Sequence, residues 1–165
     1  MNKLFILLIT LISISGCNKF DSKEKSKQTD ELKKAKVLLR QGEYGAAMDR
    51  LEKLKSKYNN NKVFWNTYGM VLRYNAYLDL DPSLRQKEIS AFKKAVEFDR
   101  EFIPARMNLA VSLWETGNRN EATIHYQKVL DLNPSHKDAK TIRNRIKLIN
   151  TQNSPKDNSD KKKTP

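Results

Sequence analysis

Residues 117–134 read GNRNEATIHYQKVLDLNP, and a turn signal stands at each end of this stretch. A Gly-Asn pair opens it and an Asn-Pro pair closes it. Such pairs are typical of helix ends, because glycine readily adopts left-handed backbone and proline cannot continue a helix. Between them, apolar residues recur at helical rather than alternating spacing. The stretch therefore predicts one helix over residues 119–131.

The rest of the chain has the same construction. Apolar residues recur three and four positions apart, and glycine, asparagine or proline separates each segment from the next. No window sustains the alternation typical of a β-strand. The pattern predicts an all-α domain over residues 29–150, with helices at 29–41, 44–57, 62–79, 83–98, 103–115, 119–131 and 136–149.

The predicted helices repeat with a fixed period of about 34 residues. A shift by one period pairs Phe92 with Tyr126, whereas the pairing of Leu72 with Leu113 needs a shift that is longer by seven. Seven extra residues therefore lie between Leu72 and Glu88. A single helix pair cannot bury its apolar face alone, so neighbouring pairs are expected to stack.

The repeat resembles the tetratricopeptide repeat (TPR) family, whose unit is a helix–turn–helix of about 34 residues. The matching residues are Ala35, Gly42, Ala47, Trp65, Gly69, Phe92, Ala95, Gly117, Ala122, Tyr126 and Pro134. The sequence departs from the family pattern at Arg100, Arg106 and Ala110, where proline, tryptophan and glycine are common.

This resemblance implies a TPR-type α-solenoid of three units. They cover about residues 28–61, 62–102 with the seven-residue insertion, and 103–136, and a helix at 136–149 would cap the last unit. That helix could instead be a basic docking helix. The alternative fold is an unrelated bundle of seven helices with coincidental spacing.

In the TPR family, the first helices of the units line a groove that takes a peptide or helix of a partner protein. The resemblance places the following residues in the groove: Leu32, Lys36, Leu39, Arg40, Val63, Asn66, Met70, Arg73, Tyr74, Met107, Val111, Trp114 and Glu115. Aromatic, methionine and arginine side chains are enriched at protein interfaces, so we expect a protein partner. Some of these residues can instead belong to the core between units.

Co-chaperones of the family grip a peptide carboxylate with lysine and asparagine at fixed groove positions. In this chain those positions hold Leu32, Lys36, Thr67, Pro104 and Asn108, so that clamp is not expected. The seven-residue insertion is expected to lengthen both helices of the second unit. Its tyrosines either pack against the added turns or contact a partner.

The N-terminus has the layout of an export signal. Lys3 precedes an apolar run over residues 4–14, and Ser15-Gly16 stands before Cys17. The run is too short to span a bilayer, which needs about 20 apolar residues. The stretch ISGC that ends at Cys17 resembles the lipobox of bacterial lipoproteins. The alternative is an incidental cysteine in an uncleaved hydrophobic N-terminus.

The lipobox resemblance implies that residues 1–17 are a lipoprotein signal peptide, with diacylglycerol and an acyl chain attached to Cys17. Asn18 rather than aspartate follows the cysteine, which favours the outer membrane over the inner membrane. Residues 18–28 and 151–165 are polar and charged, so we expect a flexible tether and a disordered basic tail.

The formal net charge is +13, and much of it lies near the C-terminus. Nucleic acid is not expected as a partner, because the aromatic residues follow the repeat positions instead of interleaving with the lysine-rich tail. A basic cap and tail could instead bind anionic lipid or an envelope polymer, through Lys161, Lys162 and Lys163.

Enzyme chemistry has little support in the sequence. His125 and His136 lie eleven residues apart without metal-ligand spacing, and the single cysteine excludes a disulfide within the chain. Phosphate-binding glycine loops and serine-nucleophile motifs are absent from the sequence. The sequence therefore predicts a membrane-anchored, non-enzymatic adaptor lipoprotein that needs no metal, cofactor or small-molecule substrate. We expect it to bind a protein partner in the groove and to support assembly of a cell-envelope complex.

Overall fold

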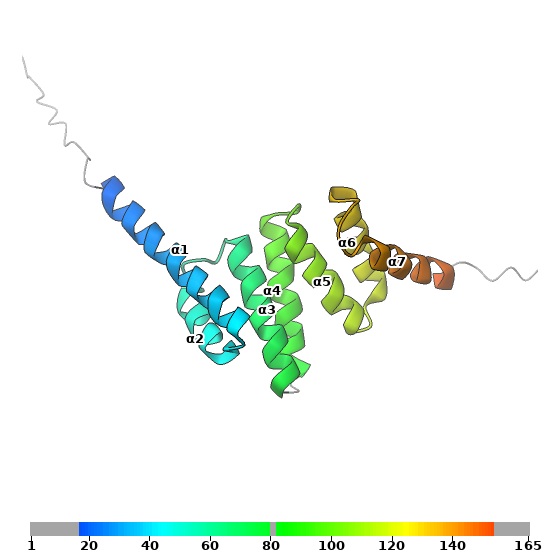
Figure 1. The fold of residues 1–165 in the computed structure, drawn as a ribbon, viewed down its shortest axis with the longest axis horizontal. Helices are drawn as coiled ribbons and strands as arrows, with labels where there is room; N and C mark the ends of the chain where they lie inside the picture. Colours follow the sequence, from blue (N-terminus) through cyan, green and yellow to red (C-terminus); the bar gives the residue numbers. More distant parts are fainter. Residues whose placement is uncertain (1–16, 80–81, 154–165) are drawn as a thin grey trace, which may run out of the picture.

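The computed structural model describes residues 17–79 and 82–153, and every regular element in these ranges is an α-helix (Figure 1). The elements are α1 (Cys17–Gln41), α2 (Tyr44–Leu54), α3 (Lys62–Asp79), α4 (Pro82–Phe98), α5 (Ile103–Glu115), α6 (Arg119–Leu132) and α7 (Ala139–Asn153). The predicted all-α fold is confirmed. Most of the predicted ends agree within one residue, but α1 begins at Cys17 instead of residue 29, and α2 ends three residues early, at Leu54. α7 runs over Ala139–Asn153 instead of 136–149, so its last turn includes the first three residues of the predicted disordered tail.

α1 begins at Cys17, so residues 18–28 have helical backbone where the sequence predicted a flexible tether. The segment contains lysine, glutamate and glutamine, which are good helix formers, and it lacks glycine and proline. Extending an existing helix is far less costly than nucleating a new one. A polar composition therefore did not prevent the helix from continuing. Residues 1–16 of the predicted signal peptide (1–17) and residues 154–165 of the predicted basic tail (151–165) lie outside the described residues.

The helices stack as a solenoid of pairs, with α1 at one end and α7 at the other (Figure 1). α1 packs on α2, α3 on α4, and α5 on α6, while α2–α3, α4–α5 and α6–α7 contacts join successive pairs. The first helices also meet, α1 with α3 and α3 with α5. Within the described ranges, none of the helices is both long and apolar enough to cross a membrane.

Glycine turns join the two helices of the first and third pairs. Gly42 and Gly117 have φ of 81° and 84°, a left-handed conformation that other residues adopt only with strain. After each glycine, a backbone N–H bonds back into the preceding helix, from Glu43 to the Leu38 carbonyl at 3.0 Å and from Asn118 to the Leu113 carbonyl at 2.8 Å. This is the Schellman arrangement, and its recurrence shows that both turns are closed in the same way.

The core runs along the stack as two clusters, and the partly buried Met70 and Val96 pack against both of them. The first pair and α3 share one cluster around the fully buried Leu51 and Phe64, and the later helices share a second cluster around Leu109 and Tyr126. α7 contributes Ile142, which is fully buried, to the second cluster. The apolar stripe of α7 therefore covers the end of the third pair.

Candidate functional site

A groove of about 600 Å³ lies between α1 and α3, the first helices of two neighbouring pairs. Its lining residues are Lys33, Lys36, Val37, Leu39, Arg40, Asn66, Thr67 and Met70. Five of these eight were predicted from the repeat register, so the fold brings together the first-unit and second-unit parts of the predicted groove. We call the side of the solenoid that carries the predicted groove residues of α1, α3 and α5 the inner face.

Cationic side chains line the α1 side of this groove. Lys36 and Arg40 have no carboxylate within ion-pair distance among the described residues, and Arg40 only donates from Nε to the backbone of Lys36, at 3.3 Å. Lys33 pairs with Asp30 at 3.4 Å, and both side chains are solvent-exposed. Val37 adds an apolar surface that is 42 % exposed. The groove thus combines uncompensated positive charge with accessible apolar area.

Three of the predicted groove residues, Leu32, Leu39 and Asn66, are largely buried. Leu32 and Leu39 are only 7 % and 8 % exposed and belong to the first core cluster. Leu39 still borders the groove, whereas Leu32 does not line it. Val63 is partly buried against the same cluster.

Arg73 was predicted to face the groove, but its guanidinium joins the second unit to the third. Nε donates to Oε1 of Glu88 at 2.7 Å, and Nη2 donates to the carbonyl of Asn108 at 2.8 Å and to Oγ of Ser112 at 2.7 Å. Its side chain is 15 % exposed and that of Glu88 is 0 % exposed. Arg73 therefore holds α3, α4 and α5 together and is not free to meet a partner.

The sequence analysis did not predict a role for Glu88 in the site, although its repeat position indicates one. It stands at the repeat position that Ala47 and Ala122 occupy in the other two units, and both alanines are fully buried. A carboxylate at a position buried by the repeat must find cationic partners, because an unpaired buried charge is very costly. The long side chain of Arg73 supplies that partner from the neighbouring helix.

A second arginine extends the network toward the inserted turns. Arg85 Nη1 pairs with Oε2 of Glu88 at 2.9 Å, and Arg85 Nη2 pairs with Glu115 at 3.2 Å. The hydroxyl of Tyr77 donates to the same oxygen of Glu115 at 2.9 Å. Glu115, a predicted groove residue, is therefore engaged within the protein. Two arginines and two glutamates leave the middle of the inner face with no net charge.

The inserted residues lengthen both helices of the second pair, as expected. α3 has 18 residues and α4 has 17, against 13 and 14 in α5 and α6. Tyr74, another predicted groove residue, stacks on Tyr44 of α2, with ring centroids 4.7 Å apart and the rings nearly parallel. Tyr74 remains 40 % exposed and Tyr77 50 % exposed, so this edge presents aromatic surface.

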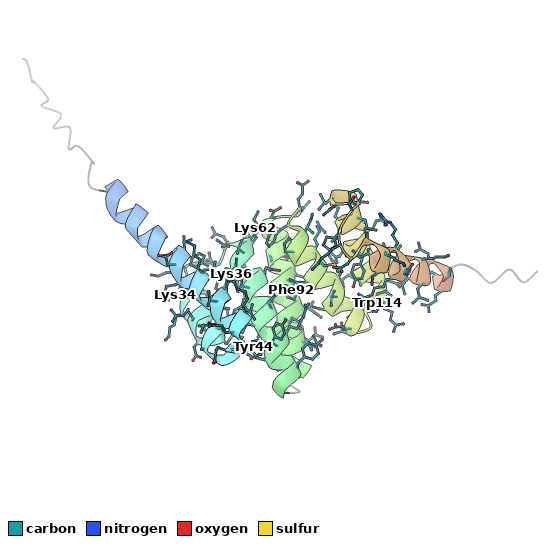
Figure 2. The ribbon with its side chains drawn as sticks, in the orientation of Figure 1. Lys34, Lys36, Tyr44, Lys62, Phe92 and Trp114 are labelled. Atoms are coloured by element: carbon teal, nitrogen blue, oxygen red, sulfur yellow. The ribbon has the colours of Figure 1, made fainter. Side chains whose placement is uncertain are left out.

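The third unit presents Trp114 at the far side of the stack from Lys36 (Figure 2). The indole lies beneath two guanidinium groups, at 5.0 Å from Arg145 of α7 and 5.4 Å from Arg119 of α6. Arg145 also donates a hydrogen bond to the hydroxyl of Tyr126, whose pKa burial raises above its ordinary value despite this cation. The sequence interpretation treated α7 mainly as a cap and missed Arg145.

The remaining predicted groove residues lie where the register places them. Met107 and Val111 are partly buried against the second core cluster, and Asn66 accepts a hydrogen bond from the side chain of Asn108 at 2.9 Å. In the ranges that the structure describes, no group of three or more histidine, cysteine, aspartate or glutamate side chains could hold a metal ion.

Residues 103–136 match the family model described as a tetratricopeptide repeat. No curated protein sequence matches the chain significantly.

Solved structures with the same fold include three with TPR-type names or bound peptides. One is the first TPR of Spaghetti (RPAP3) bound to the HSP90 peptide SRMEEVD, at 21 % identity and a TM-score of 0.63, covering 76 % of this chain and 94 % of that chain. Another is the second TPR domain of human RPAP3 with the HSP70 peptide SGPTIEEVD, at 18 % identity and a TM-score of 0.63, covering 74 % and 97 %.

The third is the type III secretion chaperone SycD of Yersinia enterocolitica in complex with a peptide of the translocator YopD. It is 12 % identical, with a TM-score of 0.65, and the match covers 78 % of this chain and 96 % of that chain. Together with the family match, these structures show that the fold is a TPR-type helical solenoid. At such identities they show the fold alone.

Proposed function

We propose that this protein is a non-enzymatic adaptor that binds a segment of a partner protein along the inner face of its solenoid. The observation that carries this proposal is the groove between α1 and α3, where Lys36 and Arg40 lack carboxylate partners within residues 17–79 and 82–153 and lie beside the exposed side chain of Val37. Free cations next to apolar surface favour a segment that contains both acidic and apolar residues.

Solved structures of this fold support a peptide as the kind of guest. The RPAP3 domains hold peptides of HSP90 and HSP70, and SycD holds a peptide of YopD. In this chain, the inner face would take a segment of its own partner. A fold shared at low sequence identity does not indicate which peptide sequence this chain binds.

The carboxylate clamp of co-chaperones does not account for this groove. Asn108, at one clamp position, donates to Asn66 and accepts from Arg73, and the hydroxyl of Thr67 donates to its own helix at Val63, at 2.8 Å. These polar groups are already engaged within the protein. A partner held mainly by its C-terminal carboxylate is therefore not part of the proposal.

Attachment to a membrane is the second element of the proposal. The stretch ISGC ending at Cys17 supports lipidation of that cysteine, with the outer membrane favoured by Asn18. Two or more acyl chains anchor a protein stably, whereas one chain gives only marginal binding. The adaptor would then hold its partner beside the envelope and support assembly of an envelope complex.

Site-specific photo-cross-linking in the native host tests the adaptor function. A photoreactive residue at Val37 lies in the groove, whereas the same residue at Lys53 lies on the exposed side of α2 and serves as the matched control. We expect a defined partner to cross-link from position 37 and not from position 53, and Met70→Glu to abolish the product because it places a charge in the groove. Identical products from both positions would refute the groove as the binding site.

A further inference from the structure

One repeat position forms a row across the inner face. One repeat period separates Lys36 from Met70 and Val111 from Arg145, and one period plus the insertion separates Met70 from Val111. The four residues belong to α1, α3, α5 and α7 in chain order. The row therefore has a cation at each end and two apolar side chains in its middle.

Contacts in the structure join the members of the row into one surface. Lys36 and Met70 line the same groove. Met70 is packed against both core clusters and Val111 against the second, so the two apolar members share the second cluster. One helical turn beyond Val111, the ring of Trp114 lies 5.0 Å from the guanidinium of Arg145.

The charges along this surface are uneven. Among the described residues, neither Lys36 nor Arg145 has a carboxylate within ion-pair distance. In the middle, Arg73 and Arg85 are neutralised by Glu88 and Glu115. Free positive charge on the row is thus confined to its two ends.

We propose that the partner segment carries acidic residues at two places with an apolar stretch between them, one acidic place meeting Lys36 and the other Arg145. This inference rests on the proposed adaptor function and defines the chemistry of its partner. Packed helices lie about 10 Å apart, so three steps from α1 to α7 span on the order of 30 Å. An extended chain rises about 3.3 Å per residue, which places the acidic residues about nine positions apart.

Arg145 is prepared for this role by its surroundings. Its guanidinium is held against the Trp114 ring and donates to the Tyr126 hydroxyl, so little side-chain freedom remains to be lost on binding. A planar guanidinium also recognises carboxylates with two parallel hydrogen bonds. In this proposal α7 contributes to the binding surface as well as covering the last pair.

Fluorescence anisotropy with designed peptides tests the proposal on the full chain in detergent. The probe carries two glutamates at each end of an eight-residue spacer with leucines at its centre, so the inner glutamates lie about nine positions apart. Matched peptides replace the glutamates by glutamine at one end or at both, and another series shortens the spacer to six and three residues. We expect the doubly acidic peptide to bind best, with about a fivefold loss for each end that is neutralised.

Variants of the protein test whether Lys36 and Arg145 are the two cations that the acidic residues of the peptide meet. Lys36→Glu and Arg145→Gln should each weaken the doubly acidic peptide about fivefold, and together by the product of the two effects, since the sites are far apart. Lys53→Glu and Lys140→Glu change exposed cations away from the row and should leave the affinity unchanged. A peptide with lysines at one end should regain affinity for Lys36→Glu, which a folding defect could not produce.

Three results would overturn the proposal. They are equal binding of the acidic and neutral peptides, loss in neither the Lys36 nor the Arg145 variant, and absence of binding by every peptide. Vesicles containing phosphatidylglycerol provide a separate arm: binding of vesicles but not peptides, lost in the same two variants, would assign the row to a membrane surface. If photo-cross-linking still captures a partner through the groove, the adaptor function stands although the two-ended partner does not.

Discussion

Arg73 of α3 donates from Nε to the fully buried carboxylate of Glu88 at 2.7 Å. The contact crosses from one helix to its partner in the second pair, and the same guanidinium continues to the backbone of Asn108 in the third pair. A charged pair thus occupies a place where the other units have only a small side chain. It ties neighbouring units together at the site of the insertion.

We expect Glu88→Ala to destabilise the protein by about 3–5 kcal/mol, because it restores the small residue of the other units but leaves the largely buried Arg73 without its carboxylate partner. Urea unfolding followed by circular dichroism measures the change. The double variant Arg73→Leu with Glu88→Ala removes both charges and should recover much of the loss. Equal stability of the single and double variants would show that the pair is not coupled.

Gly69→Ala should destabilise the second pair by about 1–3 kcal/mol. A Cβ at this position would lie 2.6 Å from Cε1 of Phe92, so the ring or the helix must shift. Gly45→Ala is the matched control on α2, where an added Cβ meets nothing within 4 Å and a better helix former should be neutral or slightly stabilising. Thermal unfolding of both variants measures the difference in stability. Equal destabilisation at both positions would contradict a specific clash with Phe92.

The stability should fall as the pH drops below about 6.5, through His125. Burial lowers the pKa of this imidazole below its ordinary value of 6.5, and the Arg106 guanidinium, 3.4 Å from Nδ1, and Lys93 lower it further, against an opposing effect of Glu121. Above pH 6.5 both states hold a neutral imidazole. Below it, the unfolded chain takes up a proton that the folded chain resists, until the pH passes the lower folded pKa.

His125→Gln should flatten this part of the profile, measured as the free energy of unfolding in urea between pH 7.5 and 5. His136→Gln is the control, since it removes the other histidine and leaves His125 in place. An unchanged slope in the His125 variant would assign the pH dependence to other groups.

Cys17→Ser should prevent lipidation if the N-terminal stretch is a lipobox. We expect the unaltered chain to incorporate a palmitate analogue and to sediment with membranes, and the variant to lose both properties. Ser22→Ala, five residues later, keeps the cysteine and should behave like the unaltered chain. Labelling that persists in the Cys17 variant would mean that acylation occurs elsewhere or that the segment is held by other means.

The helix pairs were predictable because their signals are local or periodic. The Gly42 and Gly117 turns occur at one repeat position, and Gly69 faces Phe92 as expected for a close helix pair. The cationic groove between α1 and α3 was partly predictable for the same reason. Lys36 and Met70 share a register position, and the fold sets them on one lining.

The partners of charged side chains were not predictable, because they depend on contacts between units. Arg73 and Glu115 have the polarity of surface residues, and only the packing of α3 on α4 and α5 shows that they are engaged. Arg145 was not predicted as a groove residue, because α7 follows the last complete unit and the groove positions were assigned only to the three units. The helical backbone of residues 18–28 was not predicted, because a polar composition shows only that a segment has no core to bury. It does not show whether a neighbouring helix extends into that segment.

The unbroken course of α1 has a mechanical consequence. Its 25 residues rise about 1.5 Å each, so the helix is a rod of roughly 37 Å from Cys17 to Gln41. Lys36 and Arg40 lie near one end of this rod, and the proposed lipid attachment point is at the other. Because a continuous helix, and not a flexible linker, would connect the lipid to the groove, the orientation of the bilayer would set the direction in which the groove opens. A proline or a pair of glycines introduced near residue 25 would uncouple that direction from the membrane while leaving the stack itself untouched.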